Sequence, residues 1–471
     1  MPGEGKEGDA GTRGVLIRAE NGDVIGFDET GLILRLSDSV VDELRARLGR
    51  PAEDPMQVLG DIDAWDLRRE GAWHRFTARL EEGPRGYQRP VGGGDIIAAA
   101  PGPLLALLSL GGARRAGFNS GPPTFPFNVL APGDHIGAVG LEGTGTATPC
   151  GQVQRVAHAT RDTLIADTLL HWRHAARQAL PLFMCRTETD GTADVAALCE
   201  GTGYANFLTA ADSLVACAGT LGKRAQVLAV GLDFGLEDVV SDAGALVRGL
   251  QAVMARVERD LNRRGLRRPI FVATFESGTR EIGDHPVMQA HWELAWQHGA
   301  HDLVFSAPAY MFDIARFGRP TDPARIRMAE MDAHAIAARI ARQEWLCPLF
   351  LLAEVQGRRI RVVARALDDL VIDATDPFDA GPGRGFSVSG GVQVDEVQVA
   401  PDDSRALILT CDRAPDPGAT LFYACGGTPG GDRPANRGAI RDGWQAESRA
   451  GGLLHRWAYP CALPLHPGDV P

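Results

Sequence analysis

The sequence predicts an α/β fold with a parallel sheet, preceded by a small α+β domain and followed by an antiparallel β domain that we expect to be a sandwich. Between Pro101 and Gln343, apolar runs of strand length alternate with helix-length periodic segments, which is typical of a parallel sheet covered by helices on both faces. From Trp345 onward, short apolar runs alternate with Gly, Pro and Asp clusters. The expected domains are therefore 1–95, 96–344 and 345–471.

The N-terminal domain is expected to contain a hairpin, a helix and a linker. Residues 15–27 form two apolar runs around Asn21-Gly22, a dipeptide that accepts the positive φ of a tight turn. A helix with its cap at residues 37–38 should follow. Residues 81–95 are rich in Gly, Pro and Arg and are predicted to be loop or linker.

Four strands of the parallel sheet are predicted from apolar runs, at 104–110, 225–230, 269–275 and 302–306. After the second strand, a helix capped by residue 241 or 242 is predicted. The apolar residues of this segment recur along one face of a helix. Further helices are predicted near Asp284, with Pro286 in the first turn, and over 328–341. The clearest strands of the C-terminal domain are predicted at 360–363, 392–399, 406–410 and 420–424.

Composition excludes several classes of protein. The formal charge of −12, from 48 basic and 60 acidic residues, argues against a nucleic-acid partner. No run approaches the 18 or so apolar residues of a membrane span, and the start of the chain has no signal-peptide pattern. Synthesis in the cytoplasm is therefore expected. The eight cysteines have no C-x-x-C spacing and are predicted to be buried thiols.

Four short blocks follow the predicted strands in order. The first, at 111–117, is Gly-Gly-Ala-Arg-Arg-Ala-Gly, and the second contains Asp190-Gly191-Thr192 and then 201–204. The third is Phe-Gly-Leu-Glu-Asp at 234–238, and the fourth is Asp-Pro-Ala-Arg at 322–325. Together with the C-terminal domain, these blocks resemble the SGNH hydrolases of the sialate O-acetylesterase type, and in particular a phage-derived branch. The resemblance implies a three-layer αβα domain with its site at these blocks.

The resemblance also shows which catalytic residues are replaced. The family has a nucleophilic serine in a G-Q-S-like turn, a glutamate in H/Q-G-E-x-D and a histidine in D-x-x-H. Here Ala113 stands at the serine, Leu236 at the glutamate and Arg325 at the histidine, while Asp322 matches the aspartate. A methyl group cannot attack a carbonyl, and a guanidinium stays protonated near neutral pH. Catalytic function is therefore expected to be lost.

The function implied by the resemblance is non-catalytic recognition of a cell-surface polysaccharide by a spike or fibre of a phage or gene transfer agent. The N-terminal domain would attach to the particle, the protein would form a homo-oligomer on the particle surface, and no cofactor or metal is implied. Two alternatives stay open: an active O-acetylesterase acting on an acetylated glycan, and a structural particle component without a ligand. The candidate binding residues are Arg114, Arg115, Gly191, Asp238, Asp322 and Arg325.

The charged residues of the first and third blocks could either bind a ligand or have purely structural roles. Arg114 and Arg115 are awkward to bury unpaired, so we expect either an acidic ligand or a salt bridge to Asp322. The pair Glu237 and Asp238 is expected to be solvated turn carboxylates rather than an acid/base pair.

Other side chains offer weaker alternatives. Ser109 or Ser120 could be a displaced nucleophile, although local hydrogen bonding is favoured for both. His334 could reach Asp322, but a place on a helix surface is favoured. His171 and His174 are three residues apart, a spacing that can bind zinc, although no further ligand motif accompanies them. Trp292 and Trp296 are four residues apart and could stack on a sugar, although such helical aromatic pairs are more often part of the core.

Overall fold

The computed structural model describes residues 14–19, 22–28, 31–34, 36, 40, 55–80, 83–140, 145–191, 193–235, 237, 241–277, 286–315, 318–425 and 437–468. The chain divides into two compact units, Met1–Gly93 and Gly94–Pro471, and each is described by itself. No helix within these ranges is long and apolar enough to cross a membrane. The predicted boundary between 344 and 345 stays a prediction, since both sides belong to the second unit.

The first unit begins with the predicted hairpin. Strands β1 (Gly14–Ala19), β2 (Gly22–Asp28) and β3 (Gly31–Leu34) form an antiparallel sheet in which Ala19 pairs with Gly22. The helix expected after residues 37–38 lies outside the described residues, apart from position 40. A short helix, α2 (Pro55–Leu59), precedes the next sheet.

A second antiparallel sheet corrects the linker predicted at 81–95. Strands β4 (Ala64–Glu70), β5 (Trp73–Leu80) and β6 (Gly83–Pro90) pair in order, and β6 runs through most of that segment. Tyr87 pairs across the sheet with Phe76, and their rings stack at 6.3 Å. Both side chains are buried. Cross-strand aromatic packing therefore outweighs the Gly, Pro and Arg composition that predicted a loop.

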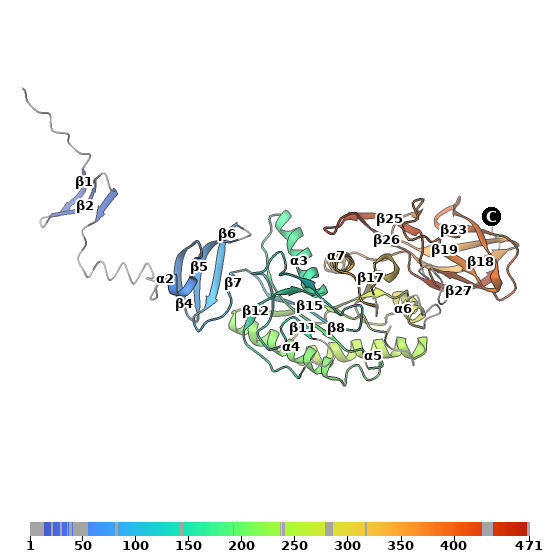
Figure 1. The fold of residues 1–471 in the computed structure, drawn as a ribbon, viewed down its shortest axis with the longest axis horizontal. Coiled ribbons are helices and arrows are strands. Elements are labelled where there is room, and N and C mark those ends of the chain that lie inside the picture. The colour runs from blue at the N-terminus through green and yellow to red at the C-terminus, as the bar shows by residue number, and fades with distance from the viewer. Residues whose placement is uncertain are drawn as a thin grey trace, which may run out of the picture. The chain divides into compact units, whose positions relative to one another are not determined.

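The centre of the second unit is a mostly parallel sheet (Figure 1). Its strand order is β12-β10-β14-β8-β15-β16-β17, and only the pairing of β10 with β12 is antiparallel. This confirms a mixed α/β class, and each of the four predicted strands overlaps one of these. The bounds are β8 (Leu104–Gly111), β10 (Val129–Pro132), β12 (Val153–Arg155), β14 (Leu182–Thr189), β15 (Ala225–Gly231), β16 (Ile270–Phe275) and β17 (Leu303–Pro308). Short strands are β7 (Ile97–Ala98), β9 (Asn119–Ser120), β11 (Val139–Gly140) and β13 (His158–Ala159).

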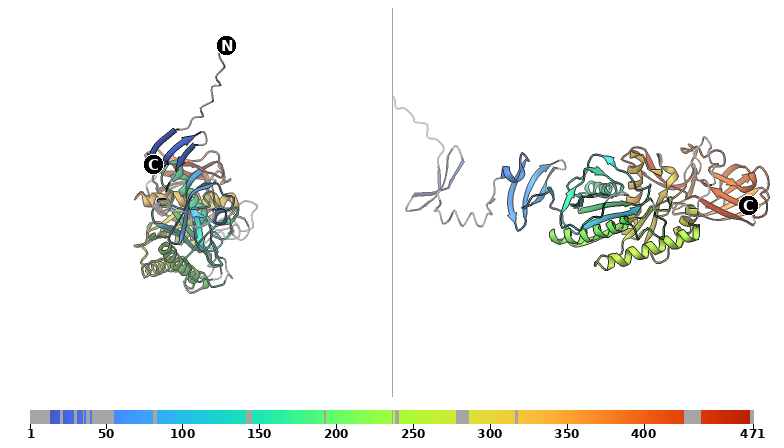
Figure 2. Two further views of the ribbon diagram at one scale, coloured as in Figure 1. Left: turned by 90° about the vertical axis from the view of Figure 1, so that its left-hand side faces the viewer. Right: turned by 60° about the horizontal axis from the view of Figure 1, so that its bottom comes forward.

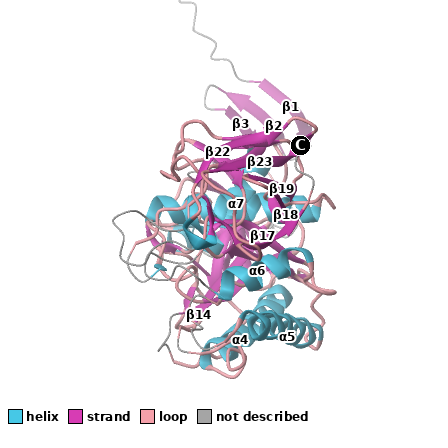
Figure 3. Ribbon diagram, turned by 90° about the vertical axis from the view of Figure 1, so that its right-hand side faces the viewer, coloured by secondary structure: helices cyan, strands magenta, loops and turns pink. Residues whose placement is uncertain are grey.

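Several helices accompany this sheet. In Figures 1 and 3, α4 and α5 lie together on the side away from α7. α5 begins at the predicted cap, where the Asp242 side chain accepts a hydrogen bond from the amide of Ala245 at 2.7 Å. The helices are α3 (Arg161–Ala175), α4 (Thr202–Thr220), α5 (Ala243–Asn262), α6 (Pro286–Trp296), the 3₁₀ turn η1 (Ala309–Met311) and α7 (Asp322–Ile340).

Helix α7 starts earlier than predicted, at Asp322 rather than at Met328. The Thr321 side chain accepts a hydrogen bond from the amide of Ala324, and a proline lies in the first turn. Both features favour a helix start. The fourth sequence block is therefore the first turn of a helix.

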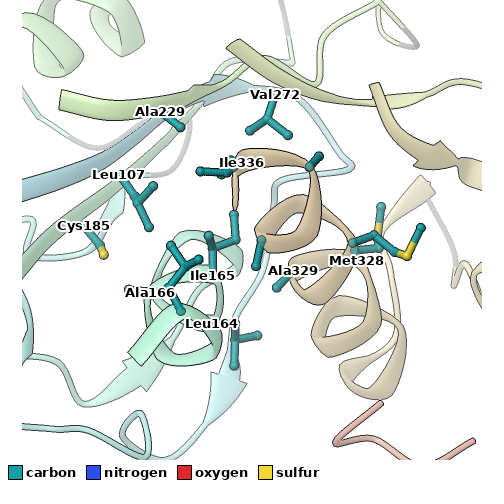
Figure 4. Close-up of a cluster of buried hydrophobic side chains, with 14 of the residues drawn as sticks. Leu107, Leu164, Ile165, Ala166, Cys185, Ala229, Val272, Met328, Ala329 and Ile336 are labelled. Carbon is teal, nitrogen blue, oxygen red and sulfur yellow. The ribbon is translucent and has the colours of Figure 1, made fainter. Parts of the chain in front are cut away.

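The core on the α3 and α7 side joins the two helices to the sheet. Leu107, Ala229 and Val272 come from neighbouring strands, and Ile165 and Ile336 come from the helices (Figure 4). All are nearly or fully buried. Apolar burial of this kind is the main stabilising term of the fold, and it holds α3 and α7 against the sheet.

The C-terminal part is a β domain (Figure 2). One sheet has the order β21-β24-β27-β18-β19-β23-β22 and another has the order β20-β25-β26. The expectation of purely antiparallel pairing is wrong at β18 and β27, which run parallel. These strands are far apart in sequence, so the intervening chain supplies the crossover that parallel pairing requires.

The elements of this domain are β18 (Leu349–Gln356), β19 (Arg359–Arg365), β20 (Leu370–Ile372), β21 (Phe386–Val388), η3 (Ser389–Gly391), β22 (Val394–Ala400), β23 (Asp403–Cys411), β24 (Thr420–Tyr423), β25 (Ile440–Glu447), β26 (Leu453–Trp457) and β27 (Cys461–Pro467). Each of the four strands predicted here overlaps one of these.

Candidate functional site

The turn after β8 holds the residue that stands at the serine of the resembled family. The amide of Gly112 donates to the carbonyl of Asp233 at 2.9 Å, and the amide of Ala116 donates to the carbonyl of Gly112 at 3.1 Å. The amide of Ala113 donates to Oε1 of Glu237 at 2.5 Å. A carboxylate from the segment after β15 is therefore bound at the backbone of this turn.

Gly112 is required for this arrangement. A Cβ atom at position 112 would lie 2.1 Å from Cδ of Glu237, so a larger residue would displace the carboxyl group. Burial raises the pKa of Glu237 above its ordinary value, although the hydrogen bond from the Ala113 amide opposes the shift. The prediction that Glu237 is a solvated turn carboxylate is wrong. The position of Glu237 within the third block could have indicated that its carboxyl group lies at the turn after β8.

The second and third blocks are only partly described. The amide of Asp190 donates to the carbonyl of Gly111 at 2.9 Å, which places the start of the second block beside the end of β8. Gly191 follows it and is exposed. Phe234 is buried, whereas Leu236 and Asp238 lie outside the described residues.

The fourth block binds back to the segment that follows the turn. Nη1 of Arg325 donates to Oδ1 of Asp322 at 3.0 Å, and Nη2 donates to the carbonyl of Pro320 at 3.0 Å. Arg325 also donates to the Asn119 side chain. A Cβ atom at Gly117 would lie 2.8 Å from Nη2 of Arg325. The buried guanidinium thus joins α7 to residues 117–119. Arg325 therefore has a structural role here, and it cannot act as a general base because it stays protonated.

Arg114 does not bind Asp322, contrary to one of the two expected arrangements. Its guanidinium makes a bidentate contact with Glu276, with N–O distances of 2.9 and 2.6 Å, and Nη1 donates to the carbonyl of Gly318 at 2.8 Å. Burial would raise the pKa of Glu276, but the Arg114 guanidinium holds it below its ordinary value. Asp322 is instead paired with Arg325, which lies one helical turn along α7.

Arg115 belongs to a buried charge network, which we define as Arg115, Arg161, Asp162, Asp233 and Asp332. Arg115 lies 2.6 Å from Asp233, 3.0 Å from Asp162 and 3.3 Å from Asp332. Arg161 contacts both Asp332 oxygens at 2.8 Å and Asp233 at 3.0 Å. All five side chains are almost completely buried. The predicted salt bridge of Arg115 to Asp322 is therefore also wrong, because three other carboxylates surround the guanidinium.

Two neighbours show how this network is accommodated. Ser109 Oγ donates to Asp162 at 2.5 Å, so this buried serine has a structural partner and is not exposed to a substrate. A Cβ atom at Gly231 would lie 2.5 Å from the Arg115 guanidinium. Only glycine leaves room for that side chain in β15.

The remaining candidates lie elsewhere. Ser120 is exposed in β9, which pairs with β13. His334 packs against Trp172 at a ring distance of 4.5 Å, and burial lowers its pKa to about 4. Its side chain is half-buried on α7, and among the described residues it makes no hydrogen bond or ion pair with Asp322. In the part of the chain that is described, no group of three or more His, Cys, Asp or Glu residues could hold a metal ion.

One thiol departs from the predicted burial. Cys150 is half-buried, whereas the other seven cysteines are buried. Its amide donates to Ser213 Oγ at 3.1 Å, and the Cys217 thiol donates to the Cys150 carbonyl at 3.4 Å. The neighbouring Cys217 side chain lowers the pKa of Cys150 to about 6, although burial opposes the shift.

We expect iodoacetamide to alkylate Cys150 first. At pH 7 most of this thiol is ionised, and below a pKa of about 6 the rate should fall about tenfold for each pH unit. Peptide mapping by mass spectrometry at pH 5 to 8 measures the rates. Cys461, which is buried, is the internal control. A Cys150 rate that still rises about tenfold between pH 7 and pH 8 would contradict the lowered pKa.

Comparisons with known proteins find similar solved structures only. No family model and no curated protein matches the chain. A carbohydrate acetylesterase from Xanthomonas citri is similar at 13% identity, with a TM-score of 0.49 over 80% of this chain and 84% of that chain. The N-terminal part of the bacterial S-layer protein SbsC is similar at 12% identity, with a TM-score of 0.16 over 47% and 38% of the two chains. At these values the similarities assign neither a family nor an activity to this chain.

Proposed function

We propose that this chain is a non-catalytic binding protein with the three-layer αβα arrangement of an SGNH-type carbohydrate esterase, and that it recognises a cell-surface polysaccharide. One observation carries the loss of catalysis. The backbone amide of Ala113 is bound to the Glu237 carboxylate at 2.5 Å. In a serine esterase, a backbone amide at the nucleophile stabilises the oxyanion of the tetrahedral intermediate. Here Ala113 has no hydroxyl group, and its amide hydrogen is already donated to the Glu237 carboxylate.

The candidate base supports the same proposal. Arg325 has three partners at the start of α7 and after the turn, and its guanidinium stays protonated. Asp322, which would orient a histidine, is paired with this arginine. The nucleophile, the free oxyanion donor and the base are thus all replaced.

The biological setting is the finer part of the proposal. The protein would be a spike or fibre on a particle of a phage or gene transfer agent, with the first unit attached to the particle and the second binding the host polysaccharide. The division of the chain at Gly93–Gly94 supports separate attachment and recognition roles. The particle itself follows from the sequence resemblance alone.

The test of lost catalysis uses the full chain with p-nitrophenyl acetate, an O-acetylated polysaccharide and a fluorophosphonate probe. Hydrolysis is expected at the uncatalysed rate, without labelling. Ala113→Ser should stay inactive because Glu237 and Arg325 remain, and loss of triad members typically costs about 10⁴-fold or more. Turnover that Ser120→Ala abolishes, with labelling of that serine, would establish the rival O-acetylesterase.

Binding is tested separately on a glycan array. Retention of at least one polysaccharide or oligosaccharide without turnover is the expected result. Complete absence of glycan binding by folded protein would overturn the recognition role and favour a structural component.

A further inference from the structure

A cavity lies at the opposite end of the sheet from the turn of Ala113. Its volume is about 550 Å³, which falls within the usual range of small-molecule pockets. We call it the junction cavity. It is formed by the end of α6, the first half of the edge strand β17, the end of α7 and the end of β19. Its lining includes Trp296, His298, Arg339, Arg342, Glu344 and Arg365.

Trp296 offers an exposed aromatic ring at this cavity. It is 44% exposed and packs edge-on against Trp292 at a ring distance of 5.7 Å. Nε1 of Trp292 donates to the carbonyl of Phe350 at 2.8 Å, which fixes the supporting ring. A large, amphipathic ring held by a second ring is well suited to stack on the apolar face of a sugar.

His298 also lines the junction cavity. Its Nδ1 is buried, and within the described ranges it has no hydrogen-bond partner. Buried polar atoms are rarely left unpaired in proteins. Because this atom is closed off from solvent, it lies beneath the cavity wall and is not a contact for a ligand.

The charges of the junction cavity do not balance. Arg339 is paired with Asp302, and Arg365 is paired with Glu344. Arg342 also lines the cavity and forms no ion pair with any residue that the structure describes. Three guanidiniums thus face two carboxylates. A carboxylate on a ligand would supply the counter-charge and could accept two hydrogen bonds from Arg342.

We propose that the junction cavity binds an acidic sugar residue, with its ring on Trp296 and its carboxylate on Arg342. This proposal rests on the proposed polysaccharide recognition and names its site and its ligand class. It locates binding at the amino end of the edge strand β17, whereas open α/β sheets usually bind ligands beyond the carboxyl ends of their strands.

The chain offers a matched pair of variants. Arg342 has φ 56° just after α7, and Arg177 has φ 54° just after α3. Both follow the last turn of a helix, where glycine adopts the left-handed conformation without steric cost. Arg342→Gly and Arg177→Gly should therefore both fold, and only the first removes a guanidinium from the cavity. Trp296→Ala removes the stacking ring.

The experiment applies the full chain and the three variants to an array of uronic-acid-containing, sialylated and neutral oligosaccharides, followed by calorimetry on the strongest ligand. We expect acidic glycans to bind, Arg342→Gly and Trp296→Ala to weaken binding about tenfold or more, and Arg177→Gly to have no effect. Melting curves verify that every variant is folded.

The possible failures are distinguishable. Acidic-glycan binding that survives both Arg342→Gly and Trp296→Ala would overturn the cavity as the site and leave polysaccharide recognition standing. Binding of neutral glycans alone would overturn the acidic ligand class. No binding to any glycan would overturn both this inference and the proposed function.

Discussion

Arg115→Met is expected to lower the free energy of unfolding by about 3–5 kcal/mol, because it removes one side of a buried ion network. Arg115 contacts Asp162, Asp233 and Asp332, and both the guanidinium and the carboxylates are almost fully buried. Without it, Arg161 alone would face three buried carboxylates. Methionine retains much of the apolar stem, so the loss reports mainly on charge.

Urea unfolding followed by circular dichroism measures this change, since the midpoint and slope give the free energy. Arg263→Met is the matched control. Arg263 pairs with Asp260 at 3.0 Å, but its side chain is 69% exposed. Exposed pairs contribute about 1 kcal/mol or less, so this variant should unfold almost as the parent does. Equal losses in the two variants would contradict the account of the buried charge network.

Trp345→Ala should also destabilise the second unit by about 3–5 kcal/mol, as large-to-small changes at buried aromatic residues do. Trp345 stacks on His334 of α7 at 5.9 Å and packs edge-on against Trp444 of β25 at 4.9 Å. Nε1 donates to the carbonyl of Ser306 at 2.9 Å. The side chain therefore joins α7, β17 and the C-terminal strands.

The matching control for this prediction is Trp296→Ala. Trp296 is the same residue type in the same unit, but it is 44% exposed, and we expect a loss of about 1 kcal/mol or less. Urea unfolding monitored by the remaining tryptophans compares the two. A Trp345→Ala variant as stable as Trp296→Ala would show that other contacts hold the C-terminal strands to α7.

Elements with a strong local pattern were predictable. The helix after residue 242 combines an aspartate cap with an apolar stripe, and the strand after residue 104 is a continuous apolar run. Strand β6 was missed because its stability comes from pairing with β5 rather than from its own composition. The start of α7 was missed because Asp322–Arg325 was interpreted through the resemblance rather than through the cap at Thr321.

The sequence by itself determined which chemical groups are present. Ala113 has no nucleophilic oxygen and Arg325 is no base at neutral pH, whatever the chain folds into. The tertiary structure alone decided which groups meet. Glu237 binds the Ala113 amide across 124 positions of sequence, and Arg115 meets three carboxylates rather than Asp322. Strand order and burial set these distances, since a charged group removed from water must find a partner in the space that the fold provides.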